Sequence, residues 1–476
     1  MKHPVTVCVM VFLMLASTST TGQAQDAGDW SAKKSGWQQL TEADRTVMDS
    51  LNGDFKRFLN ASKTELMATR EAIPRAESAG FEIFSEQTSV VPGKKLIFNN
   101  RDRALILVVV GREPLASGLH IIGTHIDSPR LELKARPFVS ASGFTVFKTT
   151  YHGGIKKYQW ANVPLALVGR IDRKDGTHVD VSIGAQAGDP VFLIPDVAPH
   201  EDKEMQDRKY SEVFKGEEMD PIAGSIPGDN TTLSETVKGV LKKYQVEEED
   251  FVSAELQLVP AASAADVGLD RGLTGSYGQD DKLSSFCALR ALLDLEAVPR
   301  HTALIYLSDN EESGSDNNTG ANSTFLRETV GRLLEAQSPR SFNENQVRHA
   351  LHASKAISAD VNLGLNPIFP STAEVSNTAR LGYGVSIKRY GHGFDANSEF
   401  IGQIRKILDE HHIPWQTQTP KVDVGTGGTI GQFLSREEIE VIDMGVPVLS
   451  MHSPYEISSK VDVFNFWRLM KAFLME

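Results

Sequence analysis

The sequence predicts an α/β fold, in which a layered α/β domain is interrupted by a β-rich insertion. The apolar run at residues 104–110 is typical of a strand buried on both faces of a sheet that lies between helices. Between residues 135 and 265, by contrast, short β-rich stretches alternate with turn residues, and afterwards helical and strand patterns alternate again. With 476 residues, 40% of them hydrophobic, the chain is long enough for two or three domains.

The first 24 residues have the pattern of a signal peptide. Lys2 supplies a positive charge, residues 5–16 form an apolar stretch too short to span a bilayer, and Gly22 and Ala24 suit a small-x-small cleavage site. We therefore expect an exported, periplasmic protein that has no membrane span after cleavage. An N-terminal anchor and an ordinary buried helix remain the alternatives.

Cysteine use and charge restrict the chemistry further. Cys8 lies inside the apolar stretch, so after cleavage Cys287 remains alone and no intrachain disulfide is expected. Cys287 falls in a helical pattern and is predicted to be an inert buried thiol. The formal net charge of −13 argues against nucleic acid as a partner, since phosphate binders usually carry a basic excess.

The predicted elements follow one another with polar residues at their ends. A helical pattern covers residues 37–81, with Thr41 as its N-cap. Later elements are expected as strands at 104–110, 119–122, 144–150, 165–171, 179–183 and 302–307, a helix at 282–296, and apolar runs before residue 360 and over 441–449. Several candidate ligands therefore lie where strands end, which is the edge at which open α/β sheets build their sites.

Three pairs of residues carry the chemistry of a metal site. His125 and Asp127 form a His-x-Asp pair, in which the carboxylate can orient an imidazole that binds metal. The neighbouring carboxylates at 280–281 open a helix, and only one of them is expected to bind a metal directly. Glu311 and Glu312 follow a strand, so that one can bind metal while the other serves as a base. A surface histidine, dipole-favoured acids at a helix start and a solvated acidic turn are the corresponding alternatives.

Asp360 and His452 complete the set, because each follows an apolar run. Alone, each is more often a structural residue than a ligand. Together, two histidines and several carboxylates match the nitrogen and oxygen ligands of a hydrolytic zinc pair. The sequence contains no Gly-x-Ser-x-Gly, His-Glu-x-x-His or P-loop motif.

Six segments resemble one known family. In chain order they read GTHIDSPRLELK (123–134), GQDDKLSSF (278–286), SDNEESGS (308–315), SADVNLGLNP (358–367), GTGGTIG (425–431) and DMGVPVLSMHSPYE (443–456). They resemble the aspartyl aminopeptidase / aminopeptidase I family of dizinc metallopeptidases. The resemblance implies an α/β/α catalytic domain (residues 30–134 and 266–476) interrupted by an inserted β-rich dimerisation domain (135–265). It also implies homodimers that assemble into tetrahedral dodecamers.

The same resemblance implies two Zn²⁺ ions per subunit, for which Co²⁺ or Mn²⁺ can substitute. Asp280 resembles the carboxylate that bridges the two ions. His125 and Asp360 would complete one metal site, and Glu312 and His452 would complete the other.

Four further roles are implied in the same way. Asp127 would orient His125, and Glu311 resembles the general base that deprotonates a metal-activated water. His200 resembles a residue that reaches the partner subunit's active site and stabilises the oxyanion there. Lys388 resembles the residue that meets an acidic substrate side chain. The peptide bond between residues 280 and 281 is expected to be cis.

The implied activity is the removal of single N-terminal residues from peptides, with acidic residues slightly favoured and neutral ones possible. Three departures from the family pattern bear on that preference: residues 361–365 contain no histidine, His-Ser-x-Arg-Glu reads His-Ser-Pro-Tyr-Glu, and residues 151–160 differ from the eukaryotic pattern. The alternatives are another dizinc amide hydrolase, such as a carboxypeptidase or deacylase, and a non-catalytic peptide-binding protein of the same fold.

Overall fold

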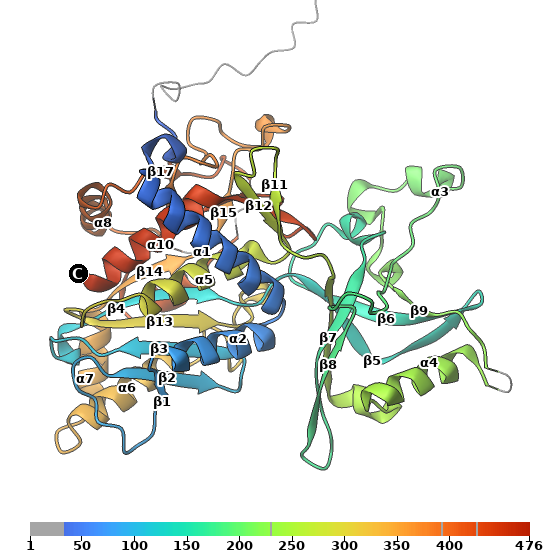
Figure 1. The fold of residues 1–476 in the computed structure, drawn as a ribbon, viewed down its shortest axis with the longest axis horizontal. Coiled ribbons are helices and arrows are strands. Elements are labelled where there is room, and N and C mark those ends of the chain that lie inside the picture. The colour runs from blue at the N-terminus through green and yellow to red at the C-terminus, as the bar shows by residue number, and fades with distance from the viewer. Residues whose placement is uncertain (1–32, 229–230, 392–393, 425–426) are drawn as a thin grey trace, which may run out of the picture.

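The computed structural model describes residues 33–228, 231–391, 394–424 and 427–476 (Figure 1). The expected signal peptide and the first two residues of the 425–431 segment lie outside these ranges. Within them, no helix is both long and apolar enough to cross a membrane.

A nine-stranded sheet forms the centre of the larger lobe (Figure 1). In spatial order its strands are β1 (Glu82–Ile83), β2 (Lys95–Asn100), β3 (Ala104–Val109), β13 (Thr302–Ser308), β4 (Leu119–His125), β14 (Lys355–Ala359), β18 (Glu440–Gly445), β16 (Val385–Lys388) and β17 (Trp415–Gln418). The four neighbours β13, β4, β14 and β18 run parallel, so their carboxyl ends meet at one edge of the sheet.

Helices cover both faces of this sheet, which confirms the predicted α/β/α arrangement. One face carries α1 (Glu42–Ala61), α2 (Glu65–Ser78), α5 (Gln279–Leu293), α8 (Ser398–Glu410) and α10 (Lys460–Met475), and the other carries α6 (Phe325–Gln337), α7 (Glu344–His352) and α9 (Gly431–Arg436). Side chains of β3 alternate between the two cores: Leu105 and Leu107 face one, Ile106 and Val108 the other. Cys287 of α5 is a buried free thiol, as predicted.

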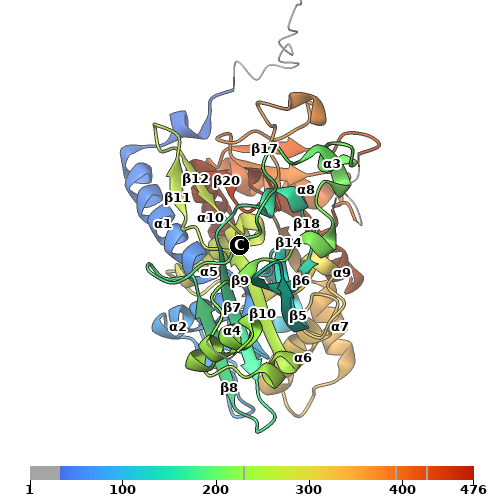
Figure 2. The same ribbon diagram turned by 90° about the vertical axis from the view of Figure 1, so that its right-hand side faces the viewer.

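A second sheet, antiparallel throughout, forms the smaller lobe, which faces the viewer in Figure 2. Its spatial order is β8 (His178–Ile183), β7 (Leu165–Asp172), β10 (Ala254–Pro260), β5 (Arg130–Ala141), β6 (Phe144–His152) and β9 (Ile222–Gly224), with α3 (Lys203–Gln206) and α4 (Leu233–Leu241) beside it. This lobe lies in the chain between β4 and β13. Its strands run from residue 130 to residue 260, whereas we expected the insertion at 135–265, because β5 begins pairing with β6 at Arg130.

A small five-stranded sheet joins the segment that follows the smaller lobe to the segments around residues 362 and 447–459. Its order is β11 (Ala265–Val267), β12 (Leu273–Ser276), β20 (Glu456–Ser459), β19 (Pro447–Leu449) and β15 (Asn362–Leu363). The apolar run over 441–449 divides between two sheets, since β18 ends at Gly445 and β19 belongs to this other sheet. At Gly445 the backbone passes so close to Asp360 that a Cβ would lie 1.8 Å from the Asp360 carbonyl oxygen.

The helical region over residues 37–81 divides in two. Thr41 caps α1, where its Oγ1 accepts a hydrogen bond of 3.1 Å from the backbone N–H of Asp44, as predicted. The break before α2 was not predicted. There Thr64 forms a new cap, and its Oγ1 accepts from the N–H of Met67 at 3.3 Å.

Candidate metal centre

Five predicted ligands lie together at the carboxyl edge of the nine-stranded sheet. His125 is the last residue of β4, Asp360 directly follows β14, and Glu312 follows β13 by four residues. Asp280 lies in the first turn of α5, and His452 follows β19 by three residues. The parallel strands β4, β14 and β13 bring His125, Asp360 and Glu312 to one edge because all three strands end there. Asp280 and His452 reach the same edge from the start of α5 and from the segment after β19.

The ligand atoms form two groups that share one residue. In each group, the donor atoms lie within 4.8 Å of one another. In the first group, Nε2 of His125 lies 3.3 Å from Oδ1 of Asp280 and 3.8 Å from Oδ1 of Asp360. In the second, Nε2 of His452 lies 3.1 Å from Oδ2 of Asp280 and 3.3 Å from Oε2 of Glu312. Asp280 thus directs one oxygen to each histidine, as a bridging carboxylate would.

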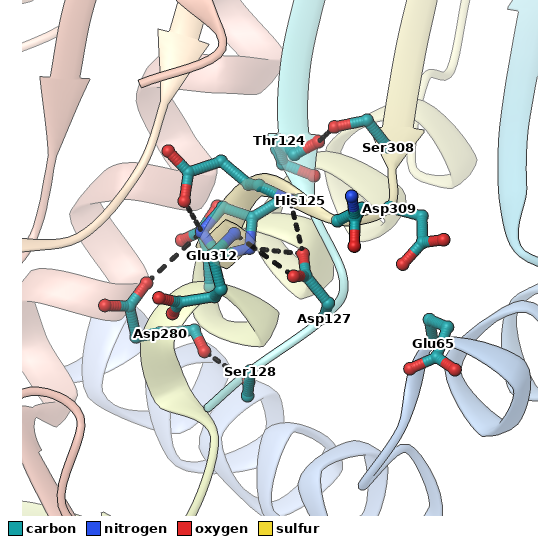
Figure 3. A network of polar contacts seen from close by, with 12 residues as sticks. Glu65, Thr124, His125, Asp127, Ser128, Asp280, Ser308, Asp309 and Glu312 are labelled. Carbon is teal, nitrogen blue, oxygen red and sulfur yellow. Dashed lines mark hydrogen bonds and ion pairs between the residues drawn. The ribbon is translucent and has the colours of Figure 1, made fainter. Parts of the chain in front are cut away.

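Asp127 orients His125 by a hydrogen bond to the ring nitrogen that does not face Asp280 (Figure 3). Nδ1 of His125 donates to Oδ1 of Asp127 at 3.1 Å, which leaves Nε2 facing Asp280. The same carboxylate accepts from the backbone N–H groups of Glu311 at 3.0 Å and Glu312 at 3.2 Å. Although Asp127 is completely buried, its hydrogen bonds to two histidines hold its pKa well below the usual range. It therefore fixes both a histidine and the segment that carries the two glutamates.

A carbonyl group orients the second histidine. Nδ1 of His452 donates to the carbonyl oxygen of Gly154 at 2.8 Å, so its Nε2 is left to face Asp280. The backbone around this histidine is held by Glu456, which is buried. Oε1 of Glu456 accepts from the N–H of His452 at 2.8 Å, and Oε2 accepts from the N–H of Asp280 at 3.1 Å.

The adjacent carboxylates at the start of α5 point in different directions, as expected. Asp281 is buried, and its Oδ1 accepts from the N–H of Val361 at 3.3 Å instead of joining either group. The peptide bond between Asp280 and Asp281 is cis, which confirms that expectation.

Several buried carboxyl groups lie close together in this site, and bound cations would compensate their negative charge. Burial raises the pKa of Glu311 to about 8 and, together with repulsion from Asp280, raises the pKa of Glu312 well above its ordinary value. Burial lowers the pKa of His452, but the carboxylates of Asp280 and Glu312 outweigh this effect and raise the pKa to about 10. Oε1 of Glu312 is buried and has no hydrogen-bond partner among the described residues. This nitrogen and oxygen donor set fits a pair of zinc ions.

Lys388 lies next to the first group. Its Nζ is 3.6 Å from Oδ2 of Asp360 and 3.3 Å from Oδ1 of Asp443. Burial lowers the pKa of Lys388, but the two carboxylates outweigh that effect, so that the pKa lies above its ordinary value and the ammonium stays charged. The structure thus brings this candidate to the metal centre.

His200 is the one candidate that the structure does not bring to the site. Its side chain is exposed in the smaller lobe, and it belongs to neither group of ligand atoms. Its expected role in a partner subunit's site remains a prediction.

The structure also shows functional residues that the sequence analysis missed. His152, at the end of β6, donates from Nε2 to Oδ2 of Asp127 at 2.9 Å. Three more were described above: Gly154 accepts a hydrogen bond from His452, Glu456 accepts one from Asp280, and Asp443 lies beside Lys388. Position 152 lies in the segment that departs from the eukaryotic pattern, whereas Glu456 is the final residue of His-Ser-x-Arg-Glu, which this chain retains; that retained glutamate was the available signal.

Comparisons with known proteins agree on one family. A family model described as aminopeptidase I zinc metalloprotease (M18) matches residues 58–474. A probable M18 family aminopeptidase 1 of Borrelia garinii subsp. bavariensis is 40% identical over 456 residues, which cover 93% of this chain and 100% of the relative. A crystal structure of an M18 aminopeptidase from Thermotoga maritima has a TM-score of 0.87 and 36% identity, covering 93% of this chain and 99% of that one. The yeast mApe1 dodecamer, at 22% identity with a TM-score of 0.73, covers 90% of this chain and 97% of that one and shares the fold.

Proposed function

Since the chain belongs to the aminopeptidase I zinc metalloprotease family (M18) and is a zinc-dependent aminopeptidase, we propose that it removes single residues from peptide N-termini at the centre around Asp280. The observation that supports this location is the shared carboxylate: Asp280 lies between two histidines, each in its own group of potential ligands.

We propose that each subunit holds two Zn²⁺ ions. His125, Asp280 and Asp360 would hold one ion, and Asp280, Glu312 and His452 the other. Co²⁺ or Mn²⁺ would substitute, because the set contains only nitrogen and oxygen donors. A bound zinc pair supplies Lewis-acid polarisation of the scissile carbonyl and a water molecule of lowered pKa.

Glu311 is the proposed general base. Its Oε2 lies 3.8 Å from Nε2 of His125, beside the ligands but outside both groups. Burial of its side chain raises its pKa to about 8, which favours a carboxylate that takes up a proton and later gives it to the leaving amine. Its backbone is fixed by the hydrogen bond from its N–H to Asp127.

Lys388 is the proposed determinant for the substrate side chain, with acidic residues slightly favoured and neutral ones accepted. An ammonium carries three N–H donors. Among the described residues, Asp360 and Asp443 lie at 3.6 and 3.3 Å from its Nζ, so that a further donor would be left for a substrate carboxylate.

The proposed assembly is a dimer formed through the smaller lobe, with dimers joined into a tetrahedral dodecamer. The dodecameric yeast mApe1 shares the fold and so supports this proposal. In such a dimer, the exposed His200 of one subunit would reach the other subunit's site and stabilise the oxyanion.

We also propose export to the periplasm, on the pattern of residues 1–24. N-terminal sequencing of protein from the periplasm should find Gln25 first if cleavage follows Ala24.

Two alternative functions predict other experimental results. Another dizinc amide hydrolase, such as a carboxypeptidase or deacylase, would cleave at a C-terminus or remove an acyl group, and a non-catalytic relative would only bind peptides. A matched pair of peptides with free and acetylated N-termini separates them, because an aminopeptidase needs the free α-amine. We expect stepwise release of N-terminal residues from the free peptide alone. Cleavage of the acetylated peptide would contradict the proposal, and so would binding of the free peptide without cleavage.

A further inference from the structure

The segment at the end of β6 brings the smaller lobe into contact with His452 directly and with His125 through Asp127. Nε2 of His152 donates to Oδ2 of Asp127 at 2.9 Å, and Asp127 holds His125. Two residues later, the carbonyl oxygen of Gly154 accepts from Nδ1 of His452 at 2.8 Å. The groups that orient the two histidines thus depend on a segment outside the nine-stranded sheet.

The buried carboxylate of Asp127 is satisfied by four hydrogen-bond donors, one for each acceptor position. The side chain is completely buried, and a carboxylate offers about four acceptor positions. Three of them are taken by groups of the larger lobe, namely Nδ1 of His125 and the N–H groups of Glu311 and Glu312. The fourth is taken by His152, the one side-chain donor that comes from the smaller lobe among the described residues.

The direction of these hydrogen bonds fixes the state of the metal ligand. Because the Asp127 carboxylate only accepts, both His152 Nε2 and His125 Nδ1 must carry the hydrogen. His125 then presents the lone pair of its Nε2 to the metal site. If His152 were absent, one buried and charged oxygen of Asp127 would lack a donor, and Asp127 would be free to turn away from His125.

We propose that His152 is a positioning residue for the metal centre, acting through Asp127 on His125 and on the segment that carries Glu311 and Glu312. The proposal rests on the proposed zinc centre. Loss of an orienting partner of a metal-binding histidine typically costs about 10- to 100-fold in metal affinity or activity.

Three variants test this role against simple space-filling. His152→Leu keeps the volume and removes the N–H donor, whereas His152→Gln places an amide N–H close to the position of Nε2. His152→Ala serves as a second donor-free variant if the leucine disturbs packing. His178, an exposed histidine of β8 in the same sheet, gives the matched control His178→Leu.

The readouts are zinc affinity, measured by competition with a chromogenic chelator, and kcat and KM for an aminoacyl substrate. Thermal unfolding of the metal-free proteins checks the fold. We expect His152→Leu and His152→Ala to lose about 10- to 100-fold in zinc affinity and to lower kcat with little change in KM. His152→Gln should recover most of both, and His178→Leu should match the unaltered protein.

Two outcomes would overturn the proposal: unchanged zinc affinity in a folded donor-free variant, or a glutamine variant as impaired as the leucine variant. A failure of the proposed function would look different. The unaltered protein would then bind zinc, and the variants would change the zinc affinity as described, yet no free peptide would be cleaved.

Discussion

Glu311 and Glu312 are neighbours in the chain, yet their side chains face opposite ends of the metal centre. Oε2 of Glu311 lies 3.8 Å from Nε2 of His125, and Oε2 of Glu312 lies 3.3 Å from Nε2 of His452. Both backbone N–H groups donate to the same carboxylate, that of Asp127. The backbone of residues 311–312, held by Asp127, therefore directs the proposed base Glu311 and the proposed ligand Glu312 to different sides of the centre.

The two glutamine variants should fail in different ways. Glu311→Gln should retain bound zinc but lose about two to three decades of kcat, which is the scale of general-base catalysis. Glu312→Gln should lose zinc, because an amide is a poorer ligand than a carboxylate. Elemental analysis and steady-state kinetics on both variants check this. The reverse pattern would exchange the two roles.

Metal removal should abolish hydrolysis. The proposed ligands form two groups of nitrogen and oxygen donors, and burial raises the pKa of Glu312 well above its ordinary value, so a bound cation would be needed to stabilise its charge. After dialysis against a chelator, Zn²⁺, Co²⁺ or Mn²⁺ should restore activity at least in part. Full activity in protein shown by elemental analysis to be metal-free would refute the mechanism.

The sequence predicts the candidate metal ligands better than it predicts the hydrogen bonds that orient these ligands. His125 and Asp360 could be found because each ends or follows an apolar parallel strand, and that rule is local. The contacts of His152 with Asp127 and of Glu456 with Asp280 join residues 25 and 176 positions apart. They depend on how two sheets meet, and no periodicity in the chain encodes that.

The same limit explains the errors in the fold. The apolar run over 441–449 predicts burial but not the sheet in which each residue is buried, so the change of sheet after Gly445 was missed. The break between α1 and α2 was missed because Thr64 is an N-cap residue inside a continuous helical pattern.

Stability should depend on pH through His120. This side chain of β4 is buried, donates from Nδ1 to the carbonyl oxygen of Phe473 at 2.9 Å and stacks on the Phe473 ring. Burial lowers the pKa of His120 from 6.5 to about 4. As the pH falls, the unfolded chain therefore binds a proton before the folded chain does. The stabilisation is complete above about pH 6.5 and is lost between about pH 6.5 and 4.

The size of this loss is about 3 kcal/mol, since one pKa unit corresponds to about 1.4 kcal/mol. Urea unfolding of metal-free protein over this pH range, compared with His120→Gln, isolates the contribution. The variant should show the smaller decline in the free energy of unfolding. Parallel curves for the two proteins would show that His120 does not titrate in this way.

Subunit mixing tests whether His200 acts across a dimer. His200→Ala and Glu311→Gln should each be nearly inactive as pure proteins, with zinc retained. In mixed dimers, the Glu311→Gln subunit would supply His200 to the intact Glu311 of its partner. Random pairing should then restore roughly a quarter of full activity, because half the dimers are mixed and each has one intact site. No recovery after dissociation and reassociation would place His200 outside the partner's site.

Lys388 is the proposed determinant for the substrate side chain, and two effects on the preference oppose each other there. Its spare N–H donor favours Asp or Glu in the substrate, whereas the carboxylates of Asp360 and Asp443 already balance its charge. A hydrogen bond to a charged group is worth about 1.5–3 kcal/mol, so loss of the ammonium should lower kcat/KM for acidic substrates by about 10- to 100-fold.

Because Lys388 also touches Asp360, a proposed ligand, Lys388→Met will weaken cleavage of every substrate to some degree. The informative quantity is therefore the ratio of kcat/KM for aspartyl and glutamyl substrates to that for a leucyl substrate, which cancels any common damage to the metal centre. We expect the ratio to exceed one in the unaltered protein and to fall in the variant. If the unaltered protein prefers the leucyl substrate and the ratio does not change in Lys388→Met, Lys388 only positions Asp360. The acidic preference would then be wrong, while membership of the aminopeptidase family would be unaffected.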